Sequence, residues 1–433
     1  MSIMLGKIIQ AFVLELYVVT LLSGCGSGGD SGTITETNNQ PSFLAKPTGI
    51  YNVGFRDFHF QDNSRCPDVF YQPGVNNRDY SPDNTNYCRE IMVRVYYPTS
   101  QTQNLGSPMY PPLVQRFVNI ATQAPNMTES DIAQLYTLQS YSTNLAPIIN
   151  NIQFPTVIFA HGGNSSVQEY ENQIVNLASY GYIVVGVNSL FIGSYIAIPD
   201  GQIVLADENA TPTIIESQQT ADLEFMYNNL TNLGTLSNSM NLSMIGATGH
   251  SYGGGAVESM IANMPGKFKA AITEDPFYGD NFSKGESVVI NGYNLPLLKM
   301  LSGTIGYAPK TLGFTLTYML NQNNYIMGMA PSNEILWQGT YPFYTVHSEF
   351  SDENTLKNMP GFQIINDDYL TYTGMTLWSN SPSSYIVTAI NENMVKFFNY
   401  YLKGNIQNNP FSSCIPLVNN TVISCGPTQY GPY

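Results

Sequence analysis

The stretch LSMIGATGHSYGGGAVESMIANM, residues 242–264, decides how the fold of this chain is interpreted. It holds one GxSxG motif, Gly249 to Gly253, with Ser251 at its centre. Because the chain has 36 Gly among 433 residues, the motif alone is weak evidence and its flanks must decide. A strand-like apolar run precedes the motif and a helix-like segment follows it, which is the context of a nucleophile elbow. The stretch therefore predicts an α/β fold that exposes Ser251 as a nucleophile at the carboxyl edge of a sheet.

Strand and helix patterns alternate on both sides of the motif. Continuous apolar runs predict buried strands, and segments with apolar residues at helical spacing predict the helices between them. Such alternation is typical of a mostly parallel central sheet with helices on both faces. The expected strands are 155–160, 182–188, 242–248, 268–274, 295–303 and 341–346, and the expected helices are 166–181, 218–233, 255–264 and 386–404.

The N-terminal part of the domain has a different pattern. Residues 49–60 and 89–98 alternate in the manner of two paired strands, separated by a polar loop. We therefore expect an N-terminal antiparallel strand layer beside the parallel sheet.

The main domain is expected to span residues 47–404, with insertions at about 101–150 and 303–338. The first insertion contains one expected helix, 129–139, which Thr128 caps. The second insertion is rich in Met, Tyr and Leu. Two interpretations of it stay open: buried packing under a loop, or a lid that faces a lipid-like substrate.

The chain is acidic and weakly charged. Charged residues make up 11% of it, and 31 acidic residues against 16 basic ones give a net charge of -15. This balance argues against a nucleic-acid partner and against electrostatic docking on anionic lipid. Any attachment to a membrane must therefore come from elsewhere.

The first residues supply such an attachment. Residues 1–24 combine a positive charge at Lys7 with an apolar run of about 15 residues, which is short for a spanning helix and fits an export signal. The residues that end at Cys25 resemble a bacterial lipobox, which implies cleavage before Cys25 and a lipid on its thiol. Residues 25–46 then form a flexible tether, and Gly26 resembles the pattern that sends such lipoproteins to the outer membrane. We expect an exported bacterial lipoprotein at the periplasmic face, outer membrane or cell surface; the alternative is an ordinary signal peptide with an incidental cysteine.

Four further cysteines suggest disulfides in an exported chain. Their short separations favour the local pairs Cys66 with Cys88 and Cys414 with Cys425, although four cysteines allow three connectivities. The second pair lies in residues 405–433, which we expect to form a C-terminal tail. The cysteines are too scattered for a zinc site, so no metal is expected.

The chain offers four histidines as the base that a serine nucleophile needs. His59 lies in the N-terminal strand layer, and His250 adjoins the nucleophile, where we expect its side chain to point away. His161 follows the first core strand, where an HG turn supplies oxyanion contacts rather than a base. His347 remains, directly after the last expected strand, and we predict that it is the base.

Six acidic residues between Ser251 and His347 are candidates for the group that orients the imidazole. Most of them lie in a helix or in polar loops, where acidic side chains are ordinarily solvated surface groups. Glu274 and Asp275 end a strand at the correct edge of the sheet, and Pro276 favours a turn just there. Alternation along the strand does not separate this pair. The six candidates are Glu258, Glu274, Asp275, Asp280, Glu286 and Glu334.

Ten stretches resemble those of one protein family, in that family's order, from about Gly49 to Gly404. They are YNVGFRDFHFQDNSR, REIMVRVYYP, FPTVIFAHGG, YGYIVVGVN, IPDGQIV, TADLEFMYNNL, GHSYGGG, DPF, VHSEFSD and FFNYYLKG. The chain is similar to the platelet-activating factor acetylhydrolase family, isoform II type with its bacterial relatives, within the α/β-hydrolase superfamily. The resemblance implies an α/β-hydrolase fold.

The resemblance also implies roles for individual residues. In that family the acid follows the nucleophile by just over twenty residues, which favours Asp275 and leaves Glu274 as the reserve. The turn after the first core strand implies an oxyanion hole made by the backbone N–H groups of Gly163 and Tyr252. No metal or cofactor is implied. The chain departs from the family in the longer spacing between the acid and His347, which bears on the substrate range rather than on the triad.

The motifs and the resemblance together predict a serine esterase that works through an acyl-enzyme on Ser251. The resemblance implies that the esters carry short-chain or oxidised acyl groups of phospholipids, as in an acetylhydrolase with phospholipase A2-like character. Two alternatives stay open: a broader lipase or polyester hydrolase, and a catalytically inactive α/β-hydrolase-like lipoprotein that binds a surface.

Overall fold

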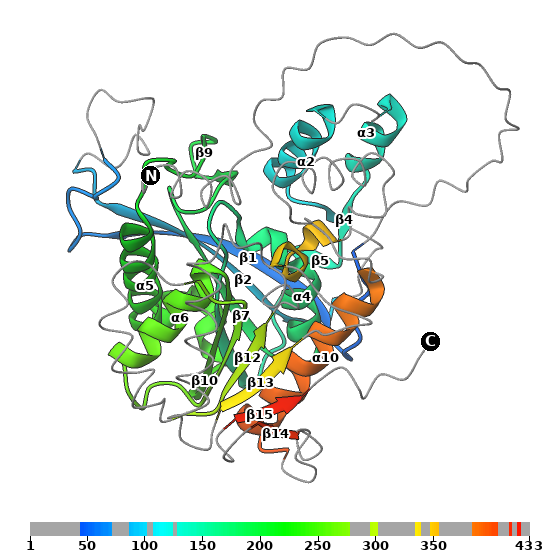
Figure 1. Ribbon diagram of the computed structural model, residues 1–433, viewed down its shortest axis with the longest axis vertical. Helices are drawn as coiled ribbons and strands as arrows, with labels where there is room; N and C mark the ends of the chain where they lie inside the picture. The colour runs from blue at the N-terminus through cyan, green and yellow to red at the C-terminus, as the bar shows by residue number, and fades with distance from the viewer. Residues whose placement is uncertain are drawn as a thin grey trace, which may run out of the picture.

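Figure 1 shows the chain as a computed structural model, with one large twisted sheet between layers of helices. The structure describes residues 44–71, 86–101, 107–123, 128–277, 295–301, 334–338, 347–354, 383–405, 415–417 and 422–425. The expected export signal, Cys25, Cys414 and the expected strand 341–346 lie outside these ranges. No helix in the described ranges is both long enough and apolar enough to cross a bilayer.

The described part of the sheet has eleven strands, ordered β14, β15, β13, β12, β11, β10, β6, β7, β2, β1, β5 across its width. They are β1 (Asn52–Asp62), β2 (Arg89–Thr99), β5 (Ser142–Asn144), β6 (Phe154–Ala160), β7 (Ile183–Ser189), β10 (Met240–His250), β11 (Ala270–Glu274), β12 (Leu297–Leu301), β13 (Glu334–Gln338), β14 (Ile415–Leu417) and β15 (Val422–Cys425).

Parallel pairing dominates the centre of this sheet. The seven strands from β15 to β7 in the order above pair in parallel. In contrast, β2 runs antiparallel to both β7 and β1, so the expected N-terminal layer is a continuation of the same sheet. All seven residues of β6 and of β7 are buried, which explains their nearly continuous apolar sequence. The mostly parallel sheet that the sequence predicts is confirmed.

Helices cover both faces of the sheet (Figure 1). On one face, α4 (Glu171–Ser179) packs with α10 (Ser383–Leu402), and their apolar side chains share a core with β6 and β11. On the other face, α5 (Pro212–Asn228) and α6 (Tyr252–Asn263) pack against β6, β7 and β10. The helices therefore leave the carboxyl ends of the parallel strands as the edge at which a site can form.

The segment 101–150 is more ordered than the sequence suggests. It contains β3 (Ser107–Pro108), α2 (Pro111–Gln123), α3 (Glu129–Leu135) and β4 (Gln139–Ser140). Thr128 caps α3 as expected, but the helix ends at Leu135 rather than at residue 139. The sequence missed α2 because it opens with two prolines, which are tolerated in the first turn of a helix. Apolar side chains of α2 and α3 form a small core of their own.

Two segments expected outside the sheet belong to it. The strand β13 lies within the expected insertion 303–338, so Glu334 begins a strand rather than occupying a polar loop. In the C-terminal tail, β15 pairs with β13 and β14 pairs with β15. These short strands cover an edge that β12 would otherwise expose. Runs of three to five residues give too little periodicity for the sequence to reveal them.

One of the two expected disulfides lies within the described residues. Cys66 and Cys88 are bonded, and they close the loop between β1 and β2. The other pair remains a prediction, because Cys414 is not described.

Candidate active site

Ser251 lies on a strained turn between β10 and α6. Its backbone has φ 55° and ψ -124°, a conformation that is unfavourable for a residue with a side chain. A Cβ atom at Gly249 would lie 2.6 Å from the Gly253 carbonyl oxygen, and one at Gly253 would lie 2.4 Å from the Ala160 carbonyl oxygen. Only glycine fits at these two positions, which explains the GxSxG pattern.

The structure brings His347 and Asp275 to this turn. Nε2 of His347 lies 3.0 Å from Oγ of Ser251, and Nδ1 lies 2.7 Å from Oδ2 of Asp275. His347 begins the short 3-10 helix η6 (His347–Phe350), and its side chain is 34% exposed. Asp275 is buried directly after β11. With the Nδ1–H group donating to Asp275, Nε2 is left to accept the serine proton.

Glu274, the other candidate acid, faces elsewhere. It is fully buried, and its Oε2 accepts a hydrogen bond of 3.1 Å from Nε2 of Gln173 in α4. Burial raises the pKa of Glu274 to about 8, so it is mostly protonated at neutral pH. Asp275 lies beyond the end of β11 with a positive φ of 42°, so its side chain leaves the backbone in a different direction from that of Glu274.

The turn after β6 lies against the nucleophile. A Cβ atom at Gly163 would lie 2.8 Å from the ring of Tyr252, and one at Gly162 would lie 3.3 Å from Cβ of Ser251. Tyr252 is the first residue of α6, where backbone N–H groups are not used within the helix. The two N–H groups expected to form an oxyanion hole, those of Gly163 and Tyr252, therefore belong to segments in close contact beside Ser251.

His161 stabilises this turn rather than acting as a base. Its Nε2 accepts a 3.0 Å hydrogen bond from the backbone N–H of Ser189, so Nδ1 carries the proton and donates to the Gly162 carbonyl oxygen at 2.6 Å. Burial lowers the pKa of His161 to about 4, which keeps it neutral. His59 lies in β1 and pairs with Glu90 at 2.9 Å. Neither histidine is placed to serve Ser251.

His250 differs from the expectation that it points away from the site. Its ring centroid lies 4.5 Å from that of His347, and its Nδ1 lies 2.9 Å from the hydroxyl oxygen of Tyr170. The same hydroxyl accepts a 3.0 Å hydrogen bond from the backbone N–H of Gly162. Burial lowers the pKa of His250 well below its ordinary value. A neutral His250 thus packs against the base and is linked, through Tyr170, to the turn after β6.

Sequence reasoning also missed the polar side chains that hold the segment of His347. Nε2 of Gln173 donates to the Phe350 carbonyl oxygen at 2.7 Å, and a carboxylate oxygen of Asp352 accepts from the backbone N–H of Asn172 at 3.1 Å. The signal in the sequence is the composition of α4, which has more polar residues than a single exposed helix face would hold. All nine residues of α4 are buried.

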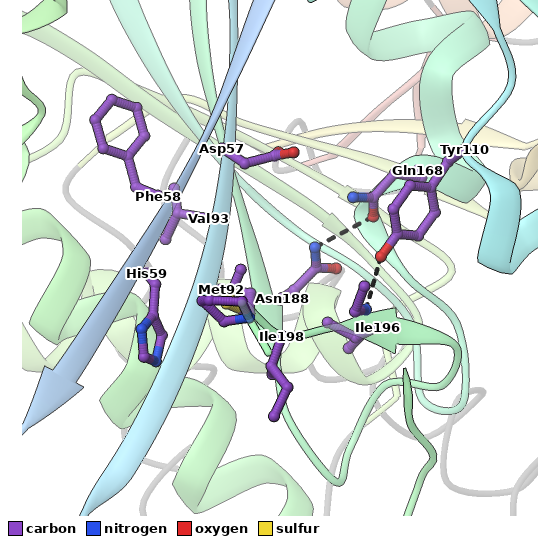
Figure 2. Close-up of a pocket in the computed structure, with 12 residues that line it drawn as sticks. Asp57, Phe58, His59, Met92, Val93, Tyr110, Gln168, Asn188, Ile196 and Ile198 are labelled. Atoms are coloured by element: carbon purple, nitrogen blue, oxygen red, sulfur yellow. Dashed lines mark hydrogen bonds between the residues drawn. The ribbon is translucent and has the colours of Figure 1, made fainter. Parts of the chain in front are cut away.

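A separate cavity of about 330 Å³ lies between the sheet and a hairpin that follows β7 (Figure 2). The hairpin consists of β8 (Ile196–Ala197) and β9 (Ile203–Val204). Tyr110 and Gln168 line the cavity, and no triad residue does. The cavity is therefore distinct from the site around Ser251. In the described part of the chain, no group of three or more His, Cys, Asp or Glu residues is arranged to hold a metal ion.

A strained serine turn, a hydrogen-bonded Ser–His–Asp arrangement and this strand order together define a serine hydrolase with the α/β-hydrolase fold. Residues 38–189 match the model of the family platelet-activating factor acetylhydrolase, isoform II, so the resemblance seen in the sequence is confirmed over that part of the chain.

Comparison of structures gives the same fold. The chain is similar to ferulic acid esterase from Streptomyces cinnamoneus, with a TM-score of 0.62 and 19% sequence identity over 86% of this chain and 97% of that one. No curated protein matches the chain. The family match supports a carboxylic ester hydrolase as the general class, and this neighbour supports the fold.

Proposed function

We propose that this protein hydrolyses carboxylic esters through an acyl-enzyme on Ser251, with Asp275 and His347 completing the triad. We propose further that its substrates are phospholipids with short-chain or oxidised acyl groups, as for a phospholipase A2-like acetylhydrolase. The observation that carries the proposal is the chain of two hydrogen bonds, 3.0 Å and 2.7 Å, that starts at a serine with positive φ.

In the first half of the reaction, Nε2 of His347 takes the proton of Ser251, and Oγ attacks the ester carbonyl carbon. The carbonyl oxygen becomes an oxyanion, which the N–H groups of Gly163 and Tyr252 stabilise by about 3 kcal/mol each. Asp275 stabilises the imidazolium that forms. His347 then donates its proton to the leaving alcohol, and the acyl group stays on Ser251.

In the second half, water replaces the alcohol. His347 removes a proton from the water molecule, the hydroxyl oxygen attacks the acyl carbon, and the same N–H groups hold the second oxyanion. Collapse of this intermediate releases the carboxylic acid, and the proton on His347 returns to Ser251.

The finer assignment to phospholipid substrates rests on the family match and on an apolar wall beside the nucleophile. The rings of Tyr252 and Phe277 pack edge to face with centroids 4.6 Å apart. The backbone N–H of Phe277 donates to the carbonyl oxygen of Ser251 at 2.8 Å, which holds the backbone of Phe277 beside that of the nucleophile. Such a wall favours an apolar acyl group over a charged one.

We propose that a lipid on Cys25 anchors the protein to a membrane, where an esterase would meet such lipids. The mature N-terminus gives a direct test. Mass spectrometry of protein extracted with detergent is expected to find a diacylated Cys25, and a soluble product that begins elsewhere would contradict the anchor.

The esterase activity is tested by hydrolysis of p-nitrophenyl acetate and butyrate. The protein is expected to hydrolyse both, and Ser251→Ala is expected to lose activity by several orders of magnitude. Equal rates for the two proteins would support a catalytically inactive, surface-binding protein instead.

The substrate class needs a second panel. Phospholipids with acetyl, oxidised and long sn-2 chains are compared with a triglyceride, a polyester and methyl ferulate. A preference for the acetyl and oxidised phospholipids supports the proposal, whereas a preference for triglyceride or polyester assigns the broader lipase or polyester hydrolase.

A further inference from the structure

Arg116 of α2 is bonded to two segments that meet at the active site. Its Nη1 group donates to the carbonyl oxygen of Asn164 at 2.9 Å and to Oε1 of Glu169 at 2.5 Å. Its Nη2 group donates to Oε1 of Glu353 at 3.0 Å. The side chain is only 13% exposed, so these bonds lie mostly away from water.

Both segments carry groups assigned to the reaction. Asn164 directly follows Gly163, whose N–H group is assigned to the oxyanion hole. Glu353 lies in the segment that begins with His347 and continues from η6. One guanidinium thus contacts the segment of the oxyanion hole and the segment of the base.

We propose that Arg116 is a positioning residue, which holds the oxyanion turn and the base segment at a fixed separation. The segment 101–150, which the sequence suggests is an insertion, then contributes to the geometry of the active site through Arg116. This inference rests on the proposed role of Ser251, His347 and Gly163. Arg116 touches none of the reacting atoms and acts through its partners.

The chemistry of the guanidinium suits this role. Its planar fork presents several N–H donors in fixed directions, so one side chain can bond to a carbonyl group and two carboxylates at once. Glu169 also accepts a 2.9 Å hydrogen bond from the backbone N–H of Ser166, which ties the guanidinium to the start of the 3-10 helix η1 (Val167–Tyr170). A lysine at this position offers one point charge and cannot span the same partners.

The helix that carries Arg116 is anchored independently of it. The hydroxyl oxygen of Tyr110 accepts a 2.7 Å hydrogen bond from the backbone N–H of Ala197, at the cavity in Figure 2. Nδ2 of Asn119 donates to the hydroxyl oxygen of Tyr195 at 3.1 Å. Leu113 and Phe117 are fully buried in the small core of α2 and α3. Loss of the guanidinium should therefore release the two active-site segments while α2 stays in place.

The first test compares Arg116→Ala and Arg116→Lys with the wild type on p-nitrophenyl butyrate. We expect kcat to fall about 10- to 100-fold in Arg116→Ala with KM changed less than about threefold, because a misplacement of about 1 Å costs about 10²-fold in rate. The kcat of Arg116→Lys is expected to lie between those of Arg116→Ala and the wild type. A kcat of Arg116→Ala within about twofold of the wild type would overturn the inference.

Arg94→Ala is the matched control for a purely structural loss. Arg94 is also buried. Its guanidinium binds both oxygens of Asp57, at 2.6 Å and 2.8 Å, and lies 3.9 Å from Oε1 of Glu171 in α4, but among the described residues it bonds to neither active-site segment. Both alanine variants are expected to unfold at a lower temperature, and only Arg116→Ala is expected to lose kcat. Millimolar guanidinium ion should restore part of the rate of Arg116→Ala and none in Arg94→Ala. Equal losses of kcat in the two variants, without rescue, would show that Arg116 serves stability alone.

A second readout does not depend on the natural ester. Labelling of Ser251 by a fluorophosphonate needs the same nucleophile, base and oxyanion hole. If the wild type is labelled but hydrolyses no ester, the proposed function fails while the labelling rates of the Arg116 variants still test their positioning role. Slower labelling of Arg116→Lys supports the inference, and equal rates contradict it, even if Arg116→Ala does not fold.

Discussion

Ser251 and His347 lie 3.0 Å apart, yet backbone contacts fix the first and side-chain contacts fix the second. The N–H group of Ser251 donates to the Glu274 carbonyl oxygen at 2.9 Å, and the carbonyl oxygen of Ser251 accepts from Phe277 and Gly255. Beside the base, in contrast, Asp275 bonds to the imidazole itself, and side chains elsewhere in the fold hold the residues that follow it.

The position of Ser251 thus depends on residues close to it in the sequence, whereas the position of His347 depends on distant ones. A strand, two glycines and a helix form the nucleophile turn from consecutive residues, so the geometry of Ser251 follows from the chain around it. The segment of His347 depends on Arg116, Asn172 and Gln173, which are far away in the sequence. A change on the nucleophile side should therefore lower stability and activity together, whereas on the base side replacement of the triad acid can lower activity alone.

The largest expected effect lies on the base side. Replacement of the triad acid by its amide removes the charge and favours the wrong imidazole tautomer, so Asp275→Asn should lower kcat by about 10⁴-fold. Stability should change much less, as thermal unfolding would show. The matched control is Glu274→Gln, which replaces a mostly protonated acid with a neutral amide and should keep kcat near that of the wild type. Equal losses in the two variants would contradict the assignment of the acid.

The next effect lies on the nucleophile side. The added methyl group in Gly253→Ala would lie 2.4 Å from backbone oxygens of Ala160 and His161, which cannot move without distorting β6. We expect a loss of about 1–3 kcal/mol in the free energy of unfolding and a fall in kcat of about 10²-fold. Gly254→Ala is the milder control, since its methyl group would meet Cβ of Pro276 at 3.0 Å. Urea denaturation and ester hydrolysis are measured on the same samples. A loss of kcat without a loss of stability, or the reverse, would contradict the expectation that the two fall together.

A smaller effect is expected where α4 holds the base segment. Gln173→Met leaves the Phe350 carbonyl oxygen without its 2.7 Å hydrogen bond, which should cost about 1–3 kcal/mol. We expect kcat to fall about tenfold because His347 begins the same short helix. Gln115→Met, at an exposed position of α2, controls for the change of side chain. An unchanged kcat in Gln173→Met would mean that the other contacts of the base and its segment position His347 without Gln173.

The same contrast explains what the sequence could predict. Ser251 followed from its neighbours, and His347 followed by elimination because the chain has only four histidines. The family spacing, not strand alternation, favoured Asp275. Contacts between distant segments gave no such signal, so the packing of His250 against His347 and the bonds of Arg116 emerged only in three dimensions.

The same holds for the edges of the sheet. Long buried runs such as β6 and β7 were evident from composition, because parallel strands covered on both faces must be apolar throughout. The strands β13, β14 and β15 are too short to show periodicity, and they form because a neighbouring edge offers unpaired backbone groups.

The last prediction concerns the protonation of Glu274, which should affect the pH dependence of protein stability and should affect activity least. Its pKa is raised by burial from 4.5 to about 8 in the folded state. Between these values the folded protein keeps a proton that the unfolded chain releases, so stability falls as pH rises through this window, by up to about 1.4 kcal/mol per pH unit. Below the window the stabilisation is complete, and above it no further loss occurs.

Glu274→Gln removes this contribution because an amide does not titrate. The free energy of unfolding, measured in urea across the window, should fall less steeply with pH in the variant than in the wild type. Other buried carboxyl groups, such as Glu169 with a pKa raised by burial to about 7, keep some slope in both proteins. Parallel curves would show that Glu274 is ionised in the folded state, and its contact with Gln173 would then have to stabilise a buried charge. The contrast between Glu274 and Asp275 thus extends from activity to stability, although the two residues are adjacent in the chain.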